Sequence, residues 1–148
     1  MNIEQRLESL GISLPDPVEA MGNYAPWVLY GDLLYLSGVG GTSSILGKLG
    51  DTVSVEDGYK LAREAALNHV AAMKAALGDL DRVDRIVRVV GYVNSTPGFT
   101  EHPAVINGVT DLYVEIFGEV GKPARAAVGM GSLPFDIPVE IETIVAVT

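Results

Sequence analysis

Two stretches of the chain carry the hydrophobic spacing of amphipathic helices. Between residues 59 and 77, apolar side chains recur at steps of three and four, while the charged residues lie largely off this apolar stripe. Ser54 or Asp57 is placed to cap the start of this helix. Residues 105–116 repeat the spacing, so the sequence predicts two long helices that each bury one side.

Short runs rich in β-branched and aromatic residues predict five strands. They lie at residues 27–30, 33–37, 86–93, 125–131 and 138–147. The first two runs flank Gly31 and Asp32, a pair that tolerates a tight turn, so we expect a β-hairpin there. The third run is apolar apart from Arg88, which is typical of a strand covered on both faces.

The order of the elements is hairpin, helix, strand, helix, strand, strand. This order predicts an α+β architecture with both long helices on one face of a sheet. We expect a single domain over residues 1–148, with an N-terminal helical appendage at about residues 1–21. Because two helices cannot cover both faces, packing against copies of the same chain is the economical way to cover the other face.

Composition supports a globular domain and argues against nucleic acid as a partner. The chain has 48% hydrophobic and 20% charged residues, and its 10 basic and 19 acidic residues give a net charge of −9. Such a charge repels phosphate backbones. Arg82, Arg85 and Arg88 lie close together, but Asp81 and Asp84 are interleaved with them. We interpret this group as an ion-paired strand entrance.

Cysteine usage and the N-terminus bear on the compartment. The chain has no cysteine, which excludes disulfides, thiolate zinc sites and cysteine nucleophiles. Residues 1–6 place an acidic residue among apolar ones, unlike a signal peptide, and no apolar run is long enough to cross a bilayer. We therefore expect a cytoplasmic protein that has no membrane partner.

Several common catalytic motifs are incomplete in this chain. The segment from Gly41 to Gly47 fails the spacing of a P-loop, and Lys48 is followed by a leucine instead of a hydroxyl residue. His69 and His102 lie on or near different predicted helices without a second histidine at ligand spacing, so we expect no metal site. No serine stands in a nucleophile elbow, which argues against a serine hydrolase.

The strands near the C-terminus carry the strongest candidate chemistry. Arg125 lies in an otherwise apolar run, and a guanidinium is costly to bury without acceptors. It either has a partner within the protein or awaits an acidic ligand. Glu140 and Glu142 are two positions apart in a predicted strand, so both point to one face. With apolar neighbours and a sheet face that needs a partner, this setting favours a pocket between subunits.

These residues resemble the YjgF family, also called the Rid or reactive intermediate deaminase family. The matches are Pro123-Ala124-Arg125, Leu133-Pro134 and Val139-Glu140-Ile141-Glu142, with support from Gly22-Asn23-Tyr24, Leu36-Ser37-Gly38 and Asn107. The resemblance runs from about Gly22 onward. It implies a chorismate-mutase-like α+β fold with a mixed sheet. It also implies a homotrimer whose sheets form a central barrel, with clefts between adjacent subunits.

The resemblance also implies an activity that needs no cofactor. In active members, the arginine that matches Arg125 grips the carboxylate of a 2-imino or 2-enamino acid. The glutamate that matches Glu140 helps to position the attacking water, and the products are a 2-keto acid and ammonia. By the same resemblance, Tyr24 and Asn107 would line or support the cleft.

Two further positions are expected to contact the substrate. Ala126 and Ala127 follow the arginine, where common family members have polar or thiol residues, and they suggest a divergent subgroup. The alternative function is a non-catalytic protein that binds or senses a small carboxylated metabolite in the same cleft. An endoribonuclease or translation inhibitor is the least favoured function, because the chain is acidic and lacks a histidine pair.

Overall fold

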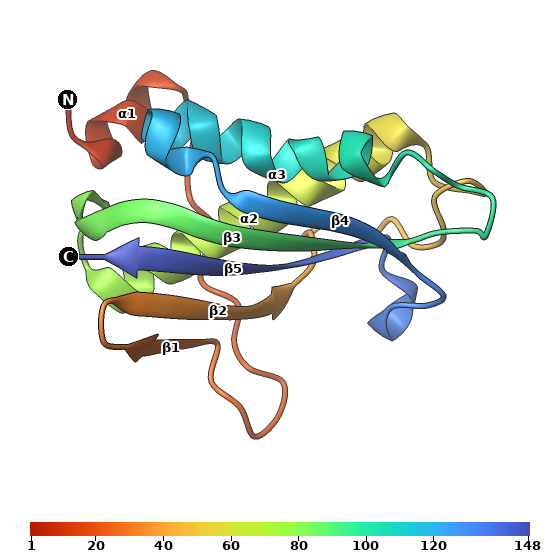
Figure 1. Ribbon diagram of the computed structural model, residues 1–148, viewed down its shortest axis with the longest axis horizontal. Helices are drawn as coiled ribbons and strands as arrows, with labels where there is room; N and C mark the ends of the chain where they lie inside the picture. Colours follow the sequence, from red (N-terminus) through yellow and green to blue (C-terminus); the bar gives the residue numbers. More distant parts are fainter.

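A five-stranded mixed sheet forms the centre of the protein. The computed structural model describes residues 1–148. The strands are β1 (Trp27–Tyr30), β2 (Leu33–Val39), β3 (Val83–Asn94), β4 (Ala124–Met130) and β5 (Val139–Val147). They lie in the order β1-β2-β5-β3-β4, and only β3 and β4 run parallel (Figure 1). All five predicted strands are present, and β3 begins earlier than expected, at Val83.

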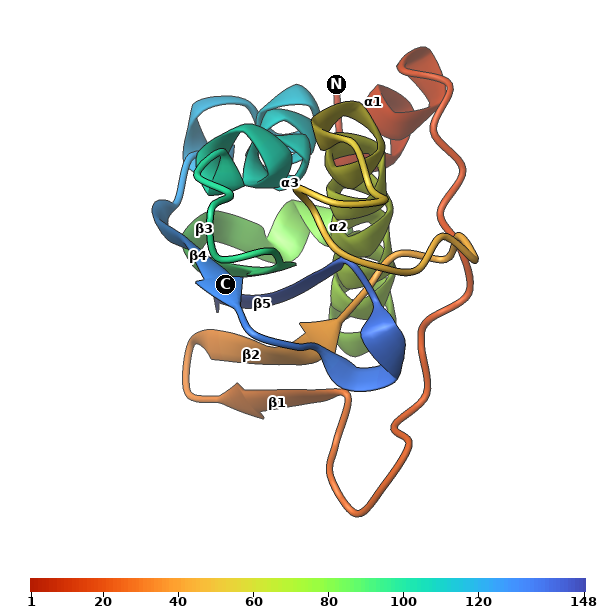
Figure 2. The same ribbon diagram turned by 90° about the vertical axis from the view of Figure 1, so that its right-hand side faces the viewer.

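Both long helices cover the same face of this sheet (Figure 2). They are α2 (Val55–Leu77) and α3 (His102–Phe117), which pack against each other and against the strands. The Ser54 side chain caps α2 by accepting a hydrogen bond of 3.1 Å from the Asp57 N–H. The predicted α+β architecture with two helices on one face is therefore confirmed, and a short helix α1 (Ile3–Ser9) adds to it.

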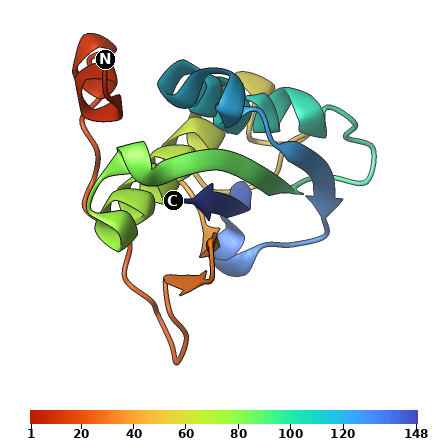
Figure 3. The same ribbon diagram turned by 60° about the vertical axis from the view of Figure 1, so that its left-hand side comes forward.

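The N-terminal helix α1 docks at the end of the sheet where the C-terminus also lies (Figures 1 and 3). Asn2 and Gln5 form a capping box at its start. Glu4 accepts a 2.6 Å charge-assisted hydrogen bond from Lys74 of α2, and Leu7 is buried in the core. Arg6 Nε also donates a 2.9 Å hydrogen bond to the Glu115 carbonyl oxygen of α3, so α1 contacts both long helices.

A buried histidine joins the helical layer to the sheet. His69 of α2 is only 1% exposed, and its two ring nitrogens lie 2.9 Å from Thr143 Oγ1 on β5 and 2.8 Å from the Ser37 carbonyl oxygen on β2. Burial disfavours the charged imidazolium and lowers the pKa of His69 to about 4. The ring is therefore neutral at physiological pH and acts as a structural bridge.

The opposite face of the sheet has no cover. Along β5, Val139, Ile141 and Thr143 point to the helices and are buried, whereas Glu140 and Glu142 point away from them. Large apolar side chains also lie exposed on this helix-free face, including Tyr35 of β2 and Val128 of β4. Exposed apolar patches of this kind often mark interaction surfaces, and self-association through this face stays a prediction.

The predicted ion pairs at the start of β3 are wrong. Arg82 donates to the carbonyl oxygens of Thr148 and Leu77, and Arg85 donates to the carbonyl oxygen of Lys122. None of the four ion pairs in the structure includes Asp81 or an arginine of this group. Backbone carbonyl groups from three separate places in the chain accept from Arg82 and Arg85 instead of the nearby aspartates.

The crossing of α2 and α3 depends on Gly108. A Cβ atom at this position would collide with the Tyr59 carbonyl oxygen of α2 and would lie 3.1 Å from the Ala62 Cβ atom. We expect Gly108→Ala to lower the free energy of unfolding by about 2 kcal/mol, because the two helices must move apart. Gly98→Ala is the matched control, since nothing lies within 4 Å of its added Cβ atom. Urea unfolding of both variants tests this, and equal midpoints would contradict it.

Candidate functional site

Arg125 lies on the edge strand β4 and points toward helix α3. Its Nη1 atom donates hydrogen bonds of 2.8 Å to Asn107 Oδ1 and 3.2 Å to Thr110 Oγ1, and both acceptors belong to α3. The parallel β3-α3-β4 connection brings α3 beside β4, which explains why residues 15 and 18 positions apart meet here. The guanidinium is thus held by two neutral oxygens.

No carboxylate neutralises Arg125. It takes part in none of the ion pairs, and no hydrogen bond of its Nε or Nη2 atoms to protein occurs. The side chain lines an open cavity of about 400 Å³ between α3 and β4. Asp111 lines the same cavity, but its carboxylate accepts a 2.7 Å hydrogen bond from the Tyr59 hydroxyl and raises the pKa of Tyr59. A charged donor therefore faces a cavity with unused N–H groups.

Glu140 lines a different cavity, of about 390 Å³, which extends from the helix-free side of the sheet to Asn68 of α2. Tyr24, Gly38 and Phe135 are among the other residues that line it. Burial is the main cause that raises the pKa of Glu140 above its usual value, and the nearby charge of Glu142 raises it further. Gly38 leaves room for this carboxyl group, because a Cβ atom there would lie 3.2 Å from Glu140 Cδ.

Glu142 has a separate hydrogen-bond partner on the same face. Its Oε1 atom accepts a 2.6 Å hydrogen bond from the hydroxyl of Tyr92 on β3. This bond is the main cause that raises the pKa of Tyr92 to about 12. Glu142 is therefore tied to the neighbouring strand, while Glu140 has no hydrogen-bond partner among the side chains.

Arg125 and Glu140 of one chain point to opposite faces of the sheet. Arg125 reaches α3 on the helical side, whereas Glu140 lies on the helix-free side. The register separates them further, because Arg125 pairs with Val89 of β3 and Glu140 pairs with Tyr92 of the same strand. A single chain therefore holds these two residues in separate cavities, which we call the Arg125 half-site and the Glu140 half-site.

The other predicted site residues divide between the two half-sites. Asn107 joins Arg125, and Tyr24 joins Glu140, where its hydroxyl accepts a 3.2 Å hydrogen bond from the Met21 N–H. Ala127 packs toward the core on the helical side of β4, whereas Ala126 points to the other face. Only Ala127 is thus on the same side of the strand as Arg125. The assignment of these residues to substrate binding stays a prediction.

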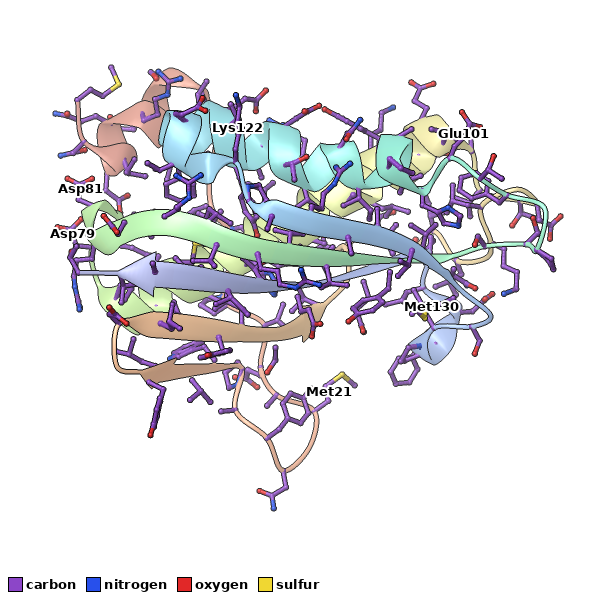
Figure 4. The ribbon with its side chains drawn as sticks, viewed as in Figure 1. Met21, Asp79, Asp81, Glu101, Lys122 and Met130 are labelled. Atoms are coloured by element: carbon purple, nitrogen blue, oxygen red, sulfur yellow. The ribbon has the colours of Figure 1, made fainter.

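Three site features were missed by the sequence reasoning. Thr110 is the second acceptor for Arg125, and its spacing of one turn from Asn107 was the available signal. Phe135 has a φ of 58°, an uncommon left-handed conformation for a bulky residue, and it is 76% exposed beside Glu140. Met21 lies on the loop that extends past β1 and lines the Glu140 cavity (Figure 4).

We also searched the structure for metal-binding side-chain groups and for membrane-spanning helices. No group of three or more His, Asp or Glu side chains is arranged to hold a metal ion. Among the helices, none combines the length and the apolar character that spanning a bilayer requires.

Comparison with known proteins places these observations in a family. The model of the family described as "YjgF/chorismate_mutase-like, putative endoribonuclease" matches residues 4–139. Protein TCP17 of Trypanosoma cruzi is 44% identical over 150 residues, which cover 97% of this chain and 92% of that protein.

Solved structures agree with this comparison. A putative endoribonuclease from Shewanella oneidensis has a TM-score of 0.94 and 32% identity. The match covers 99% of this chain and 100% of that chain. A protein of unknown function in the Rid family, YyfA from Yersinia pestis, has a TM-score of 0.63 and 26% identity, over 89% of this chain and 94% of that one. The chain belongs to the YjgF/Rid family.

Proposed function

We propose that the protein hydrolyses small 2-imino and 2-enamino acids to 2-keto acids and ammonia. The observation that carries this proposal is the state of Arg125, whose guanidinium is fixed by two neutral oxygens and keeps unused N–H groups toward a cavity. A planar guanidinium can pair with a carboxylate through two parallel hydrogen bonds, which orients the substrate as well as binding it.

The reaction follows from the groups of the two half-sites. The carboxylate of the substrate pairs with Arg125, and an enamino acid first shifts a proton from nitrogen to carbon to become the imine. Water then attacks the imine carbon, and the Glu140 carboxylate accepts one of its protons. Glu140 returns this proton to the nitrogen, which gives a carbinolamine. The hydroxyl proton of the carbinolamine then also passes to the nitrogen, the carbon–nitrogen bond breaks, and the carbonyl group forms as ammonia leaves. Holding both reactants in place supplies much of the acceleration.

The raised pKa of Glu140 suits this role. A carboxylate that is half-buried and lies near Glu142 is more basic than an exposed one. Burial and the negative charge of Glu142 both disfavour its ionised form. A stronger base takes a proton from water more readily.

The cleft that joins the half-sites would lie between copies of the chain. We propose a homotrimer in which Arg125 of one protomer faces Glu140 of the next, with the helix-free faces turned toward each other around a central barrel. The exposed apolar side chains of that face and the opposite directions of Arg125 and Glu140 support this arrangement.

A coupled assay tests the proposed activity. 2-Aminoacrylate is generated enzymatically, and the release of pyruvate is followed with and without wild-type protein. The expected result is an increase in the rate in proportion to the protein added. A rate that equals the spontaneous one, together with binding of the keto acid, would support the alternative of a non-catalytic carboxylate-binding protein instead.

The names of related proteins call for a separate control against ribonuclease activity. The matching family model carries the description of a putative endoribonuclease. RNA is incubated with protein purified away from contaminating nucleases, and no cleavage is expected, because the chain carries a net charge of −9. Cleavage that disappears in Arg125→Ala would contradict the deaminase proposal.

A further inference from the structure

A third cavity lies at the far end of β4 from Arg125. Its volume is about 430 Å³, and it shares no lining residue with the cavities of Arg125 and Glu140. It forms where the loop before α3, the start of α3 and the end of β4 meet. Figure 4 labels Glu101 and Met130 at this end of the molecule, and the Ser95 N–H donates to the Met130 carbonyl oxygen at 3.3 Å.

A lysine without a carboxylate partner lines this cavity. Lys48 Nζ donates hydrogen bonds of 2.7 Å to Asn94 Oδ1 and 2.6 Å to the Gly131 carbonyl oxygen. The nearest carboxylate in this network is Asp136, which accepts from the other side of the Asn94 amide. An ammonium has three N–H donors, so one of them remains for a ligand.

A buried serine and a histidine complete the polar wall. Ser95 is only 8% exposed, and its Oγ atom lies 3.3 Å from His102 Nε2. The ring of Phe99 packs edge to face against the imidazole at a centroid distance of 5.1 Å and fixes its orientation. Both polar groups belong to the lining of the cavity, which contains no Asp or Glu side chain.

Gly129 keeps this pair accessible. A Cβ atom at position 129 would lie 2.5 Å from His102 Nε2 and 2.8 Å from Ser95 Oγ. The missing side chain therefore leaves the space directly in front of both polar atoms empty. In a chain with 19 acidic and 10 basic residues, a cavity with a free cation, hydroxyl groups and no carboxylate is selective for an anion.

We propose that this cavity binds the phosphate group of a small phosphorylated metabolite. Lys48 supplies a point charge, Ser95 donates its hydroxyl proton, and His102 donates from Nε2 in the tautomer that carries its proton there. These donors come from three separate segments, which suits the tetrahedral oxygens of a phosphate better than the planar oxygens of a carboxylate. Phe99 and Met130 offer apolar contacts to the organic part of the ligand.

The proposal is tested by calorimetric titration at constant ionic strength. The probes are glycerol 3-phosphate, inorganic phosphate, glycerol and acetate. Wild type is expected to bind both phosphates with a Kd of about 1 mM or tighter. In Arg125→Ala, which lacks the proposed carboxylate clamp, glycerol and acetate are expected to bind at least about tenfold more weakly than glycerol 3-phosphate, because they lack the charge or the tetrahedral geometry. A lower Kd for glycerol 3-phosphate than for inorganic phosphate would identify an organic phosphate as the preferred ligand.

Two variants locate the binding. Lys48→Met is expected to weaken glycerol 3-phosphate at least about tenfold by removing a charged donor. Gly129→Ala is expected to weaken it to a similar extent by filling the space before Ser95 and His102, and it leaves the contacts of Lys48 in place. Arg125→Ala is the control and should bind like wild type, because that side chain lines another cavity.

Three results would overturn the proposal. They are no phosphate binding by wild type, acetate binding by Arg125→Ala as tight as its binding of glycerol 3-phosphate, or loss of phosphate binding in Arg125→Ala with retention in Gly129→Ala. The last result would assign the phosphate to the Arg125 cavity. Thermal unfolding of each variant shows whether lost binding reflects lost folding.

Discussion

Arg125→Ala and Glu140→Gln are each expected to be nearly inactive in 2-aminoacrylate hydrolysis, yet to regain activity when mixed. Each change alone should lower kcat/KM about 100-fold, or about 3 kcal/mol, because it removes a charged contact to the substrate or the base that acts on water. The two variants are unfolded together in equal amounts and refolded, so that the chains assemble at random.

The mixture should reach about a quarter of the wild-type activity, since that share of junctions joins an intact arginine to an intact glutamate. This outcome follows from the geometry, because the two side chains point to opposite faces in one chain. If each site were built within a single chain, every chain in the mixture would lack one of the groups. An inactive mixture of properly folded chains would therefore contradict the shared cleft.

Matched variants serve as controls for this experiment. Arg125→Lys keeps the charge but loses the planar fork, and it should retain more activity than Arg125→Ala. A mixture of Arg125→Ala with wild type should fall below the activity of wild type alone in proportion to the variant chains. Size measurements on every sample establish that the same assembly is present.

Wild-type protein is expected to lose about 3 kcal/mol of stability on acidification from pH 7 to pH 4 through His69 alone. The pKa of this buried ring is lowered to about 4 in the folded chain, whereas an exposed histidine has a pKa of about 6.5. Between these values the unfolded chain binds a proton that the folded chain does not bind. The free energy of unfolding therefore rises with pH across this window and falls as the pH drops.

His69→Gln removes this proton linkage and should give a flatter dependence of stability on pH. Chemical unfolding of wild type and variant at several pH values between 4 and 7 measures the two slopes. Lys60→Gln, on the exposed side of the same helix, is the control and should keep the slope of wild type. Equal slopes for wild type and His69→Gln would show that the ring is not buried in neutral form.

The sequence predicted those parts of the fold that depend on neighbouring residues. The hairpin at Gly31-Asp32 and the cap at Ser54 follow from local turn and capping chemistry, and both are confirmed. Helical spacing in the same way placed α3, with Asn107 on its surface. Arg125 and Glu140 could be selected because charged residues in apolar strands are unusual.

Strand register and long-range contacts could not be predicted from the sequence. The direction of Arg125 depends on its pairing with Val89, and irregular pairing earlier in β3 shifts the faces of that strand relative to its neighbours. The arginines at the start of β3 were assigned to nearby aspartates because these are close in sequence. The true acceptors are carbonyl groups such as that of Thr148, which only the folded chain brings there.

The pairing of β3 with both of its neighbours fixes the separation of Arg125 and Glu140 along the strand direction in each chain of the proposed enzyme. Arg125 lies opposite Val89 and Glu140 lies opposite Tyr92. Because the hydrogen-bonded strands cannot slide or stretch, this separation is constant. The gap that a substrate must bridge is then set by how one protomer is offset against the next. Changes in the contact surface remote from the reacting groups would alter which molecules fit, so new specificities could evolve with the chemical groups left untouched.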